Sequence, residues 1–282
     1  MSEVWPVYKK ITRKIWIILL IVLAAIPIIH PLMLPIPVSP RTQAFYDVIL
    51  KTPKGSVVVI GFSIVMISVY NDIRTFYVSL LELLCQRNFK IIFTSFGPDS
   101  PIAAEDLVKR ANIEAKYNYV YGKDYVILPY AAGDETAMAA TAADFWATYA
   151  ADNRGNKLSD LSLMKNVRSM KDVSLAIVEY HIFTYGEMFV RQWPVKYGVP
   201  TIVDGQYYGI SPYYGSYVLG NVDTFLRAEA EFEKLSGVPG EEMLKLEAAN
   251  LEFFLIVIMI FAGLVVSVSS ARKAPIKEEA KR

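Results

Sequence analysis

Two long stretches without a charged residue, one near each end, constrain the fold of this chain more than any other feature. The first runs from Ile15 to Ile36, and the second runs from Phe253 to Ser270. A helix of about 20 apolar residues, rising about 1.5 Å per residue, crosses a hydrocarbon core of about 30 Å. The sequence therefore predicts transmembrane helices at residues 15–36 and 251–270, with a domain of residues 37–250 between them.

The outer half of the first stretch is rich in proline, with Pro27, Pro31 and Pro35. Each proline removes a backbone donor and clashes with the preceding turn, so we expect the helix to bend or end there. Residues 15–25 are its expected regular part. A cleavable signal peptide is the alternative, because a basic start precedes the stretch, but the stretch is long for one and no A-x-A site ends it.

Charged residues beside the two stretches indicate the orientation. Residues 1–14 and residues 271–282 each carry a net charge of +3. Because Lys and Arg are enriched in cytoplasmic flanks, we expect a two-pass protein of the cell membrane with both tails cytoplasmic and the domain extracellular or periplasmic. The residues between the tails carry −5 of the total of +1. The two apolar stretches make the lipid bilayer an expected partner, whereas an acidic domain gives no electrostatic reason to expect nucleic acid or anionic lipid as its partner.

The pattern between the stretches predicts one doubly wound α/β domain, Rossmann- or flavodoxin-like, with a mostly parallel five-stranded sheet. Val- and Ile-rich runs alternate with helical patterns, an order that places helices on both faces of a parallel sheet. The expected strands are Ser56–Ile64, Phe89–Ser95, Asp124–Pro129, Val173–Tyr180 and Pro200–Val203. The expected helices are Asp72–Arg87, Ala103–Tyr117, Glu135–Tyr149 and Tyr185–Tyr197. The single cysteine, Cys85, excludes an internal disulfide.

Three further segments complete the predicted domain. Asp152–Ser169 is polar and contains a glycine, so we expect an exposed excursion before the fourth strand. Asn221–Leu235 repeats apolar residues at helical spacing and predicts an amphipathic helix that ends at Gly237–Gly240. No helix breaker follows Glu241, so one helix is expected to run from the domain into the second apolar stretch.

The chain resembles a set of uncharacterised prokaryotic membrane proteins in three segments, Gly122–Glu135, Leu161–Val178 and Pro212–Gly237. The likeness covers most of the chain. It implies an α/β domain between two transmembrane helices, and it implies no reaction, ligand or site residue.

Polar residues at the carboxyl ends of the expected strands form the first candidate site, because ligands of open α/β sheets bind outside these ends. Glu179 and His181 end the fourth strand, and Asp204 follows the fifth, so the three could supply a catalytic acid or base. Alternation along a strand also places Glu179 and His181 on one face, where they could simply pair with each other. The chain contains no familiar catalytic or metal-binding motif, so no cofactor or metal is predicted.

Two loops that open expected helices hold candidates for ligand binding. Asp99 and Ser100 precede Pro101, and the backbone donors of this turn could receive an anion. Asp134 and Glu135 start the helix after the third strand, and their carboxylates could bind a cation or a polar ligand. The alternative for both pairs is that they only cap their helices, which is a common role of Asp and Ser.

A Tyr-rich segment, Gly205–Gly220, is too irregular for a strand and is expected to be a loop that makes protein contacts. The candidate interface residues in it are Tyr207, Tyr208, Tyr213, Tyr214 and Tyr217. The alternative is that these tyrosines pack the loop onto its own domain. In the second apolar stretch, Gly263 and Ser267 form a small-x-x-x-small pair that lets transmembrane helices approach closely.

Two functions from different classes remain open. The tails are too short for a signalling domain, and two helices cannot enclose a transport path. We therefore favour an interaction or scaffold protein that assembles with itself or with a membrane-protein partner. The alternative is a small-molecule-binding or hydrolytic domain that uses the strand-end residues, which is an argument from fold. An enzyme is the less favoured of the two.

Overall fold

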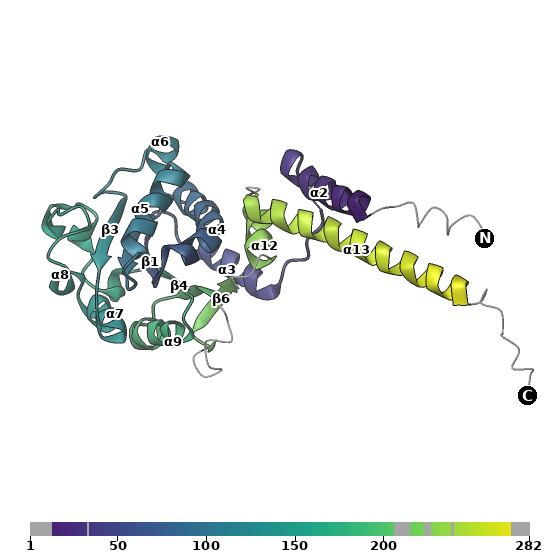
Figure 1. The fold of residues 1–282 in the computed structure, drawn as a ribbon. Helices are drawn as coiled ribbons and strands as arrows, with labels where there is room; N and C mark the ends of the chain where they lie inside the picture. Colours follow the sequence, from purple (N-terminus) through teal and green to yellow (C-terminus); the bar gives the residue numbers. More distant parts are fainter. Residues whose placement is uncertain (1–12, 33, 206–214, 223–226, 238–239, 272–282) are drawn as a thin grey trace, which may run out of the picture. The chain divides into compact units, whose positions relative to one another are not determined.

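The computed structural model describes residues 13–32, 34–205, 215–222, 227–237 and 240–271 (Figure 1). Residues 36–243 form one compact unit, the α/β domain. The described parts of residues 1–35 and 244–282 form a second unit, which consists of an N-terminal apolar helix with the short segment after it and most of the C-terminal apolar helix.

Six parallel strands form the sheet of the domain, in the order β3-β2-β1-β4-β5-β6. This is the Rossmann strand order, in which the sheet grows first to one side of β1 and then to the other. The strands are β1 (Val57–Phe62), β2 (Lys90–Ser95), β3 (Tyr125–Tyr130), β4 (Leu175–Tyr180), β5 (Thr201–Gly205) and β6 (Val218–Val222). The predicted α/β fold with a parallel sheet is confirmed, with six strands instead of five.

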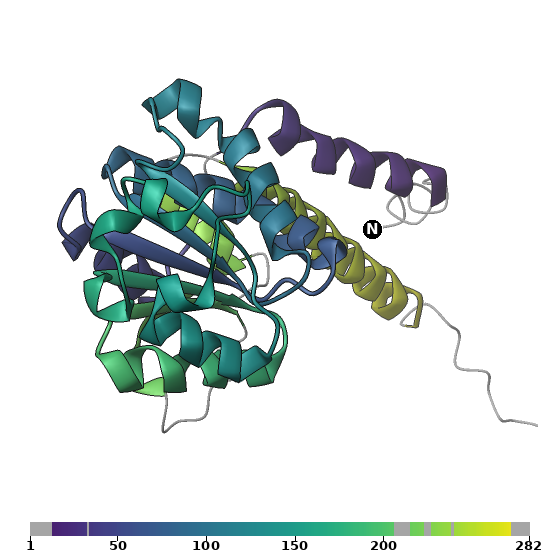
Figure 2. The ribbon, with the colours of Figure 1, turned by 90° about the vertical axis from the view of Figure 1, so that its left-hand side faces the viewer.

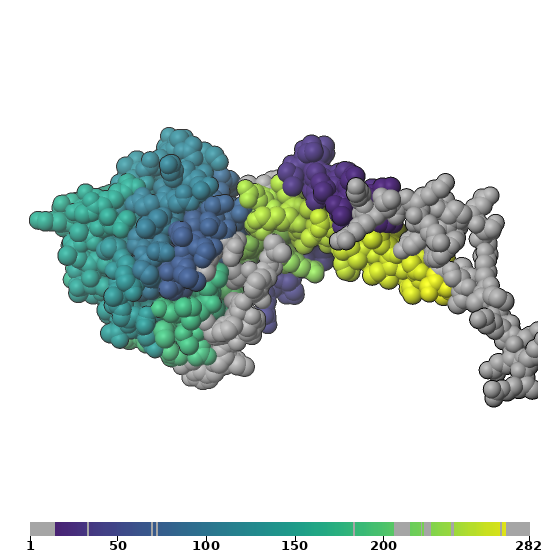
Figure 3. All heavy atoms as spheres, in the orientation of Figure 1, coloured from purple at the N-terminus to yellow at the C-terminus, as the bar shows by residue number. Residues whose placement is uncertain are grey.

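Helices cover both faces of the sheet (Figures 1 and 2). Strand side chains alternate between two cores, as Val58 and Val59 illustrate. One helical layer comprises α3 (Pro40–Lys51), α4 (Ile67–Gln86), α5 (Ser100–Ala111), α6 (Ile113–Tyr117) and α12 (Arg227–Ser236). The other comprises α7 (Asp134–Ala143), α8 (Phe145–Thr148), α9 (Phe183–Gln192), α10 (Pro194–Tyr197) and the short turns η1 (Leu158–Asp160), η2 (Met164–Asn166) and η3 (Met170–Asp172). With all atoms drawn, the blue and teal first half of the domain presents a continuous surface (Figure 3).

The sixth strand lies at the end of the Tyr-rich segment, where a loop was predicted. Gly220 obscures the strand pattern, but a Cβ at this position would lie only 2.3 Å from the backbone N of Phe45. Phe45 belongs to α3, a helix that packs on β6 and that the sequence pattern did not predict. Glycine therefore stands in this strand because a helix backbone approaches it closely.

Three expected helices are each divided in two. Asn112 separates α5 from α6 with a left-handed φ of 50°. Asp144 separates α7 from α8 and accepts the N–H groups of Trp146 and Ala147. Pro194 begins α10 directly after α9. Asn tolerates the left-handed region, Asp caps a new helix start and Pro favours the first helical position, which explains the divisions.

The Asp152–Ser169 segment is mostly exposed before β4, as predicted, but it is anchored to the domain by several buried side chains. Leu158, Leu161 and Met164 are buried against the second helical layer. Asp152 is also buried, and its Oδ1 accepts the N–H groups of Arg154 and Asn156. Buried apolar side chains and the hydrogen bonds of Asp152 therefore hold an otherwise exposed segment on the domain.

One helix of the described residues is long and apolar enough to cross a membrane. It is α13 (Glu241–Ala271), with a candidate span of Glu241–Val265, and its expected continuity from the domain is confirmed. The N-terminal helix α2 (Arg13–Ile29) has a shorter apolar part, Ile15–Ile29, below the about 20 residues of a typical span. The predicted span of residues 15–36 is not supported, since the helix ends before Pro31, which cannot continue its hydrogen bonds.

Glu233 holds the start of α13 within the domain unit. It is fully buried on α12, and its Oε2 accepts the N–H groups of Gly240 at 3.1 Å and Met243 at 2.8 Å. Burial raises the pKa of Glu233 to about 7. A Cβ at Gly240 would lie 2.0 Å from its Oε1. This contact therefore requires a glycine at position 240, and it buries a carboxyl whose pKa is raised.

Candidate functional site

The candidate site lies between β1 and β4, where the sheet changes its direction of growth. The chain leaves β1 toward β2 on one side and later enters β4 on the other, so the loops that follow β1 and β4 diverge. Ser63 begins the first of these loops and His181 begins the second. Ligands of open α/β sheets bind in the crevice at such a switch point. The predicted residues Glu179 and His181 therefore lie where a ligand is expected.

Glu179 is a buried carboxylate that orients His181. Its Oε2 accepts the N–H of Ser63 at 3.0 Å, and the Ser63 hydroxyl donates to the Glu179 backbone carbonyl at 3.0 Å. Its Oε1 contacts Nδ1 of His181, which confirms the pairing that alternation along the strand suggested. The Glu179 side chain is fully buried, whereas 24% of the His181 side chain is exposed. A fixed carboxylate thus positions an imidazole that reaches the surface, and an imidazole can transfer protons near neutral pH.

Asp204 belongs to a buried polar cluster beside this pair. It is the neighbour of Glu179 in the register of β4 and β5, and it is fully buried. Tyr77 of α4 and Glu229 of α12 are buried as well. Burial, followed by the nearby Asp204 and Glu179 carboxylates, raises the pKa of Tyr77 well above its usual value. The tyrosine therefore stays protonated and can donate to the carboxylates. The sequence pattern did not single out Tyr77 or Glu229, because both lie in amphipathic helices.

The loop after β1 is held by the turn that precedes α5. The Ser100 hydroxyl oxygen accepts the N–H of Ile64 at 3.0 Å, and Asp99 Oδ2 accepts the N–H of Ile67, the first residue of α4, at 2.8 Å. A Cβ at Gly97 would lie 2.1 Å from the carbonyl oxygen of Ile64. Asp99 occupies the N-cap position of α5, but its side chain makes no capping bond there and accepts the first N–H of α4 instead. Ligand binding by Asp99 and Ser100 stays a prediction.

Asp134 and Glu135 connect α7 to α9, and the expectation that Asp134 caps α7 is wrong. The N-cap residue is Gly133 with a left-handed φ of 118°. Asp134 follows with φ 47° and accepts the hydroxyl of Tyr185 at 2.5 Å. Glu135 accepts two bonds from Arg191, at 2.9 and 2.8 Å, and this guanidinium lowers the pKa of Glu135 to about 2. The left-handed start directs both carboxylates to α9, and their ligand binding stays a prediction.

The predicted interface residues are only partly within the described chain. Tyr207, Tyr208, Tyr213 and Tyr214 lie outside the described residues. Tyr217 precedes β6 and is 38% exposed. Gly263 and Ser267 both lie on α13, about one helical turn apart. Contact of any of these residues with another chain stays a prediction.

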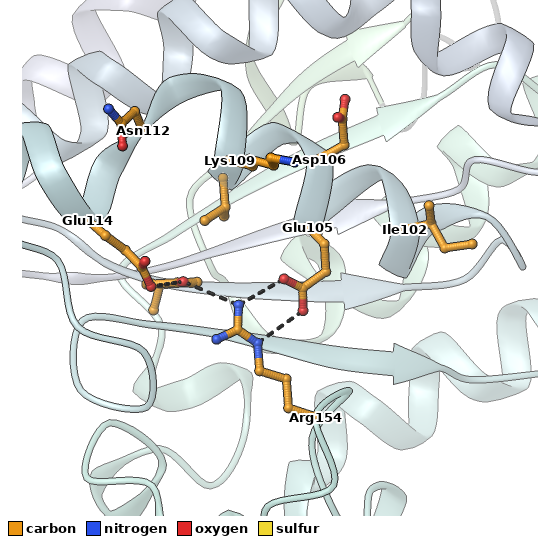
Figure 4. A pocket seen from close by; sticks show the side chains of 9 residues that line it. Ile102, Glu105, Asp106, Lys109, Asn112, Glu114 and Arg154 are labelled. Atoms are coloured by element: carbon orange, nitrogen blue, oxygen red, sulfur yellow. Dashed lines mark hydrogen bonds and ion pairs between the residues drawn. The ribbon is translucent and has the colours of Figure 1, made fainter.

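A cavity of about 460 Å³ lies on the α5 side of the edge strand β3 (Figure 4). It reaches Tyr125 at the amino end of β3, whereas the switch point is at the carboxyl ends of the strands. Arg154 forms two hydrogen bonds with Glu105, at 3.2 and 2.8 Å, and the Tyr125 hydroxyl donates to Glu114 at 2.7 Å. Because these groups bind one another, the cavity is a weaker candidate for a ligand than the switch point.

Metal binding and relatives add no further assignment. No group of three or more His, Cys, Asp or Glu side chains that could hold a metal ion occurs among the described residues. Comparisons with protein-family models, curated proteins and solved structures find no match. The functional argument therefore depends on the chemistry of the switch point itself.

Proposed function

We propose that the domain binds a small molecule at the switch point and that His181, oriented by Glu179, donates or accepts a proton there. One observation carries this proposal: a fully buried carboxylate, anchored by the Ser63 N–H, contacts a partly exposed imidazole at the carboxyl edge of the sheet. Burying an ionisable pair is a costly way to build a core, since desolvation offsets much of the attraction. Such a pair at the carboxyl edge of the sheet therefore favours a functional role.

The chemistry supported is acid–base chemistry, which includes hydrolysis by a water molecule that His181 activates. The Ser63 hydroxyl is buried and donates to the Glu179 backbone. Ser63 is therefore better suited to hold Glu179 in place than to attack a substrate.

A ligand screen by thermal shift tests the proposal on the full chain in mild detergent. Soluble nucleotides, sugar phosphates, organic acids and short acyl compounds are the probes. At least one class should raise the melting temperature of the wild type and of Lys171→Ala, a matched control at an exposed position. The same class should lose at least tenfold in affinity for His181→Asn. A wild type that responds to no class, or a His181→Asn chain that responds equally, would contradict the proposal.

The second part of the proposal concerns the membrane: α13 spans it, α2 enters it as well, and both tails are cytoplasmic. The basic flanks of the two apolar stretches support this orientation. Cysteine labelling can test it, because the single natural cysteine, Cys85, is only 1% exposed. A membrane-impermeant maleimide should label Lys157→Cys in intact cells and Ala280→Cys only after permeabilisation. The opposite pattern would invert the orientation.

Assembly with a second copy or with a membrane-protein partner is the other candidate function. Tyr217 and Leu219, at the edge strand that ends the Tyr-rich segment, are 38% and 47% exposed, which favours a contact surface there. Tyr213→Ser combined with Tyr214→Ser should shrink the detergent-extracted particle and leave the circular dichroism unchanged. A monomeric wild type, or a double variant of unchanged size, would reject assembly.

A further inference from the structure

Four exposed apolar side chains lie on the two loops that flank the Glu179–His181 pair. Val65, Met66 and Ile67 follow β1 with exposed fractions of 40%, 59% and 43%, and Ile182 follows β4 with 44%. Because β1 and β4 are parallel neighbours, both loops leave the sheet at the same edge. Both loops beside the Glu179–His181 pair therefore carry exposed apolar side chains.

The backbone of the first loop is held so that these side chains stay outside. Asp99 accepts the N–H of Ile67, and Ser100 accepts the N–H of Ile64. In the described part of the domain, residues 65–67 are the only three consecutive large apolar residues that are exposed. A contiguous apolar patch on an otherwise well-packed domain usually marks a binding surface.

The charges and the chain connection indicate what covers this patch. Residues 63–68 contain no charged side chain, so the loop offers no electrostatic attraction to a charged soluble ligand. The domain continues through α13 into an uncharged run that begins at Phe253, ten residues after Met243. Ten residues of helix span about 15 Å, so a bilayer that holds this run lies at most about that far from Met243, and acyl chains are the apolar material it supplies.

We propose that the switch-point site takes an amphipathic lipid from the bilayer, with its acyl chain on Val65, Met66, Ile67 and Ile182 and its polar group at His181. The inference rests on the proposed acid–base site and adds the class of substrate. An imidazole held by a carboxylate can exchange hydrogen bonds or a proton with a hydroxyl, ester or phosphate oxygen of such a head group.

Photo-crosslinking of the full chain in phosphatidylcholine nanodiscs tests this inference. A small fraction of the phosphatidylcholine carries a diazirine on its acyl chain, and peptide mass spectrometry locates the label. The label should appear within residues 63–68 and at Ile182, in addition to α13. Met66→Gln combined with Ile182→Gln should lower the labelling of both loops at least tenfold. Val120→Gln, a matched control that is 52% exposed at the amino end of β3, should leave it unchanged. Near-ultraviolet circular dichroism verifies that each variant is folded.

The outcomes separate the substrate class from the acid–base site. Labelled α13 with unlabelled loops overturns the lipid inference, and a soluble ligand that still binds through His181 would then leave the acid–base site standing. A diazirine-bearing octanoate, added to the chain in maltoside micelles, identifies the source. Loops labelled by octanoate and not by phosphatidylcholine overturn a bilayer source. Loops labelled by phosphatidylcholine to the same extent in wild type and His181→Asn overturn the contact of the head group with His181.

Discussion

Glu233→Gln should stabilise the domain at pH 8 and change its stability little at pH 4. The carboxyl of Glu233 is fully buried, and burial raises its pKa from 4.5 to about 7, with a further contribution from Glu242. The N–H groups of Gly240 and Met243 bind its Oε2 and favour the charged form, but they do not offset the burial. The amide oxygen of glutamine can accept the same two bonds. The substitution therefore removes the buried charge and keeps the contact.

The sign of the pH dependence follows from the raised pKa of Glu233. Below pH 4.5 the carboxyl is protonated in the folded and in the unfolded chain, so its contribution to stability is complete. As the pH rises from 4.5 to about 7, the unfolded chain loses this proton first, and the free energy of unfolding falls. One pKa unit corresponds to about 1.4 kcal/mol, so the titration of Glu233 alone should lower the free energy of unfolding by about 3 kcal/mol across this range. Above pH 7 the loss is complete.

Urea unfolding of the full chain in detergent measures this difference, with the fluorescence of Trp146 and Trp193 reporting on the domain. At pH 8 the free energy of unfolding of Glu233→Gln should exceed that of the wild type by about 3 kcal/mol, and at pH 4 the two should agree. Glu241→Gln, at an exposed position beside the same helix start, is the matched control and should follow the wild type. If Glu233→Gln is instead the less stable chain at pH 8, the carboxylate is ionised and its bonds to the helix start outweigh burial, which refutes the reasoning.

Three further substitutions test contacts of the domain by urea unfolding. Glu135→Gln should cost at most about 1 kcal/mol at pH 7, because the pair with Arg191 is about a third exposed. The pKa of Glu135 is lowered from 4.5 to about 2, so this contribution should be present above pH 4.5 and vanish as the pH falls through 2. Gly220→Val should cost about 1–3 kcal/mol or more by pushing α3 from β6, since a Cβ would lie 2.3 Å from Phe45 N. Trp193→Ala should cost about 3–5 kcal/mol, because the indole is fully buried. Unchanged stability of Gly220→Val would contradict the close packing of α3 on β6, and unchanged stability of Trp193→Ala would contradict the burial of the indole.

The sheet was largely predictable because its strands are covered on both faces. In β1 and β2 five of the six residues are buried, which produces the continuous apolar runs that the sequence shows. The pattern of apolar residues did not predict two elements, α3 and β6. Only Thr42, Phe45 and Ile49 are buried on α3, a weak helical signal, and β6 contains a glycine that is required by α3. Both failures therefore come from one contact between segments far apart in the chain.

The position of the candidate residues and the Glu179–His181 pairing were predictable, but the partners that lie far away in the sequence were not. The strand-end rule selects Glu179, His181 and Asp204 without any knowledge of side-chain contacts. The anchoring of Glu179 by Ser63 joins residues 116 positions apart, and Asp99 serves a helix 32 positions earlier. Local signals such as a capping residue before Pro101 identify which groups are polar and cannot identify which distant backbone group they bind.

Glu179→Gln separates a structural role of the Glu179–His181 pair from a chemical one. The amide oxygen of glutamine can accept the Ser63 N–H that Glu179 accepts at 3.0 Å, and the two side chains have nearly the same shape. The free energy of unfolding should therefore stay within about 1.5 kcal/mol of the wild type, the value of one hydrogen bond. The imidazole differs, because a carboxylate only accepts and fixes a proton on Nδ1, whereas an amide NH₂ donates and favours the proton on Nε2.

Nitrogen-15 NMR of the histidine rings distinguishes these two tautomers. The chain has two histidines, so a His30→Gln background leaves the signals of His181 alone. The wild type should carry the proton on Nδ1, and Glu179→Gln should carry it on Nε2 and lose its response to the ligand of the site while remaining folded. An unchanged tautomer would show that the carboxylate does not orient the ring, and an unfolded variant would assign Glu179 to the structure of the sheet. If Glu179→Gln stays folded but changes the tautomer of His181, the carboxylate is needed for proton transfer and not for the stability of the fold.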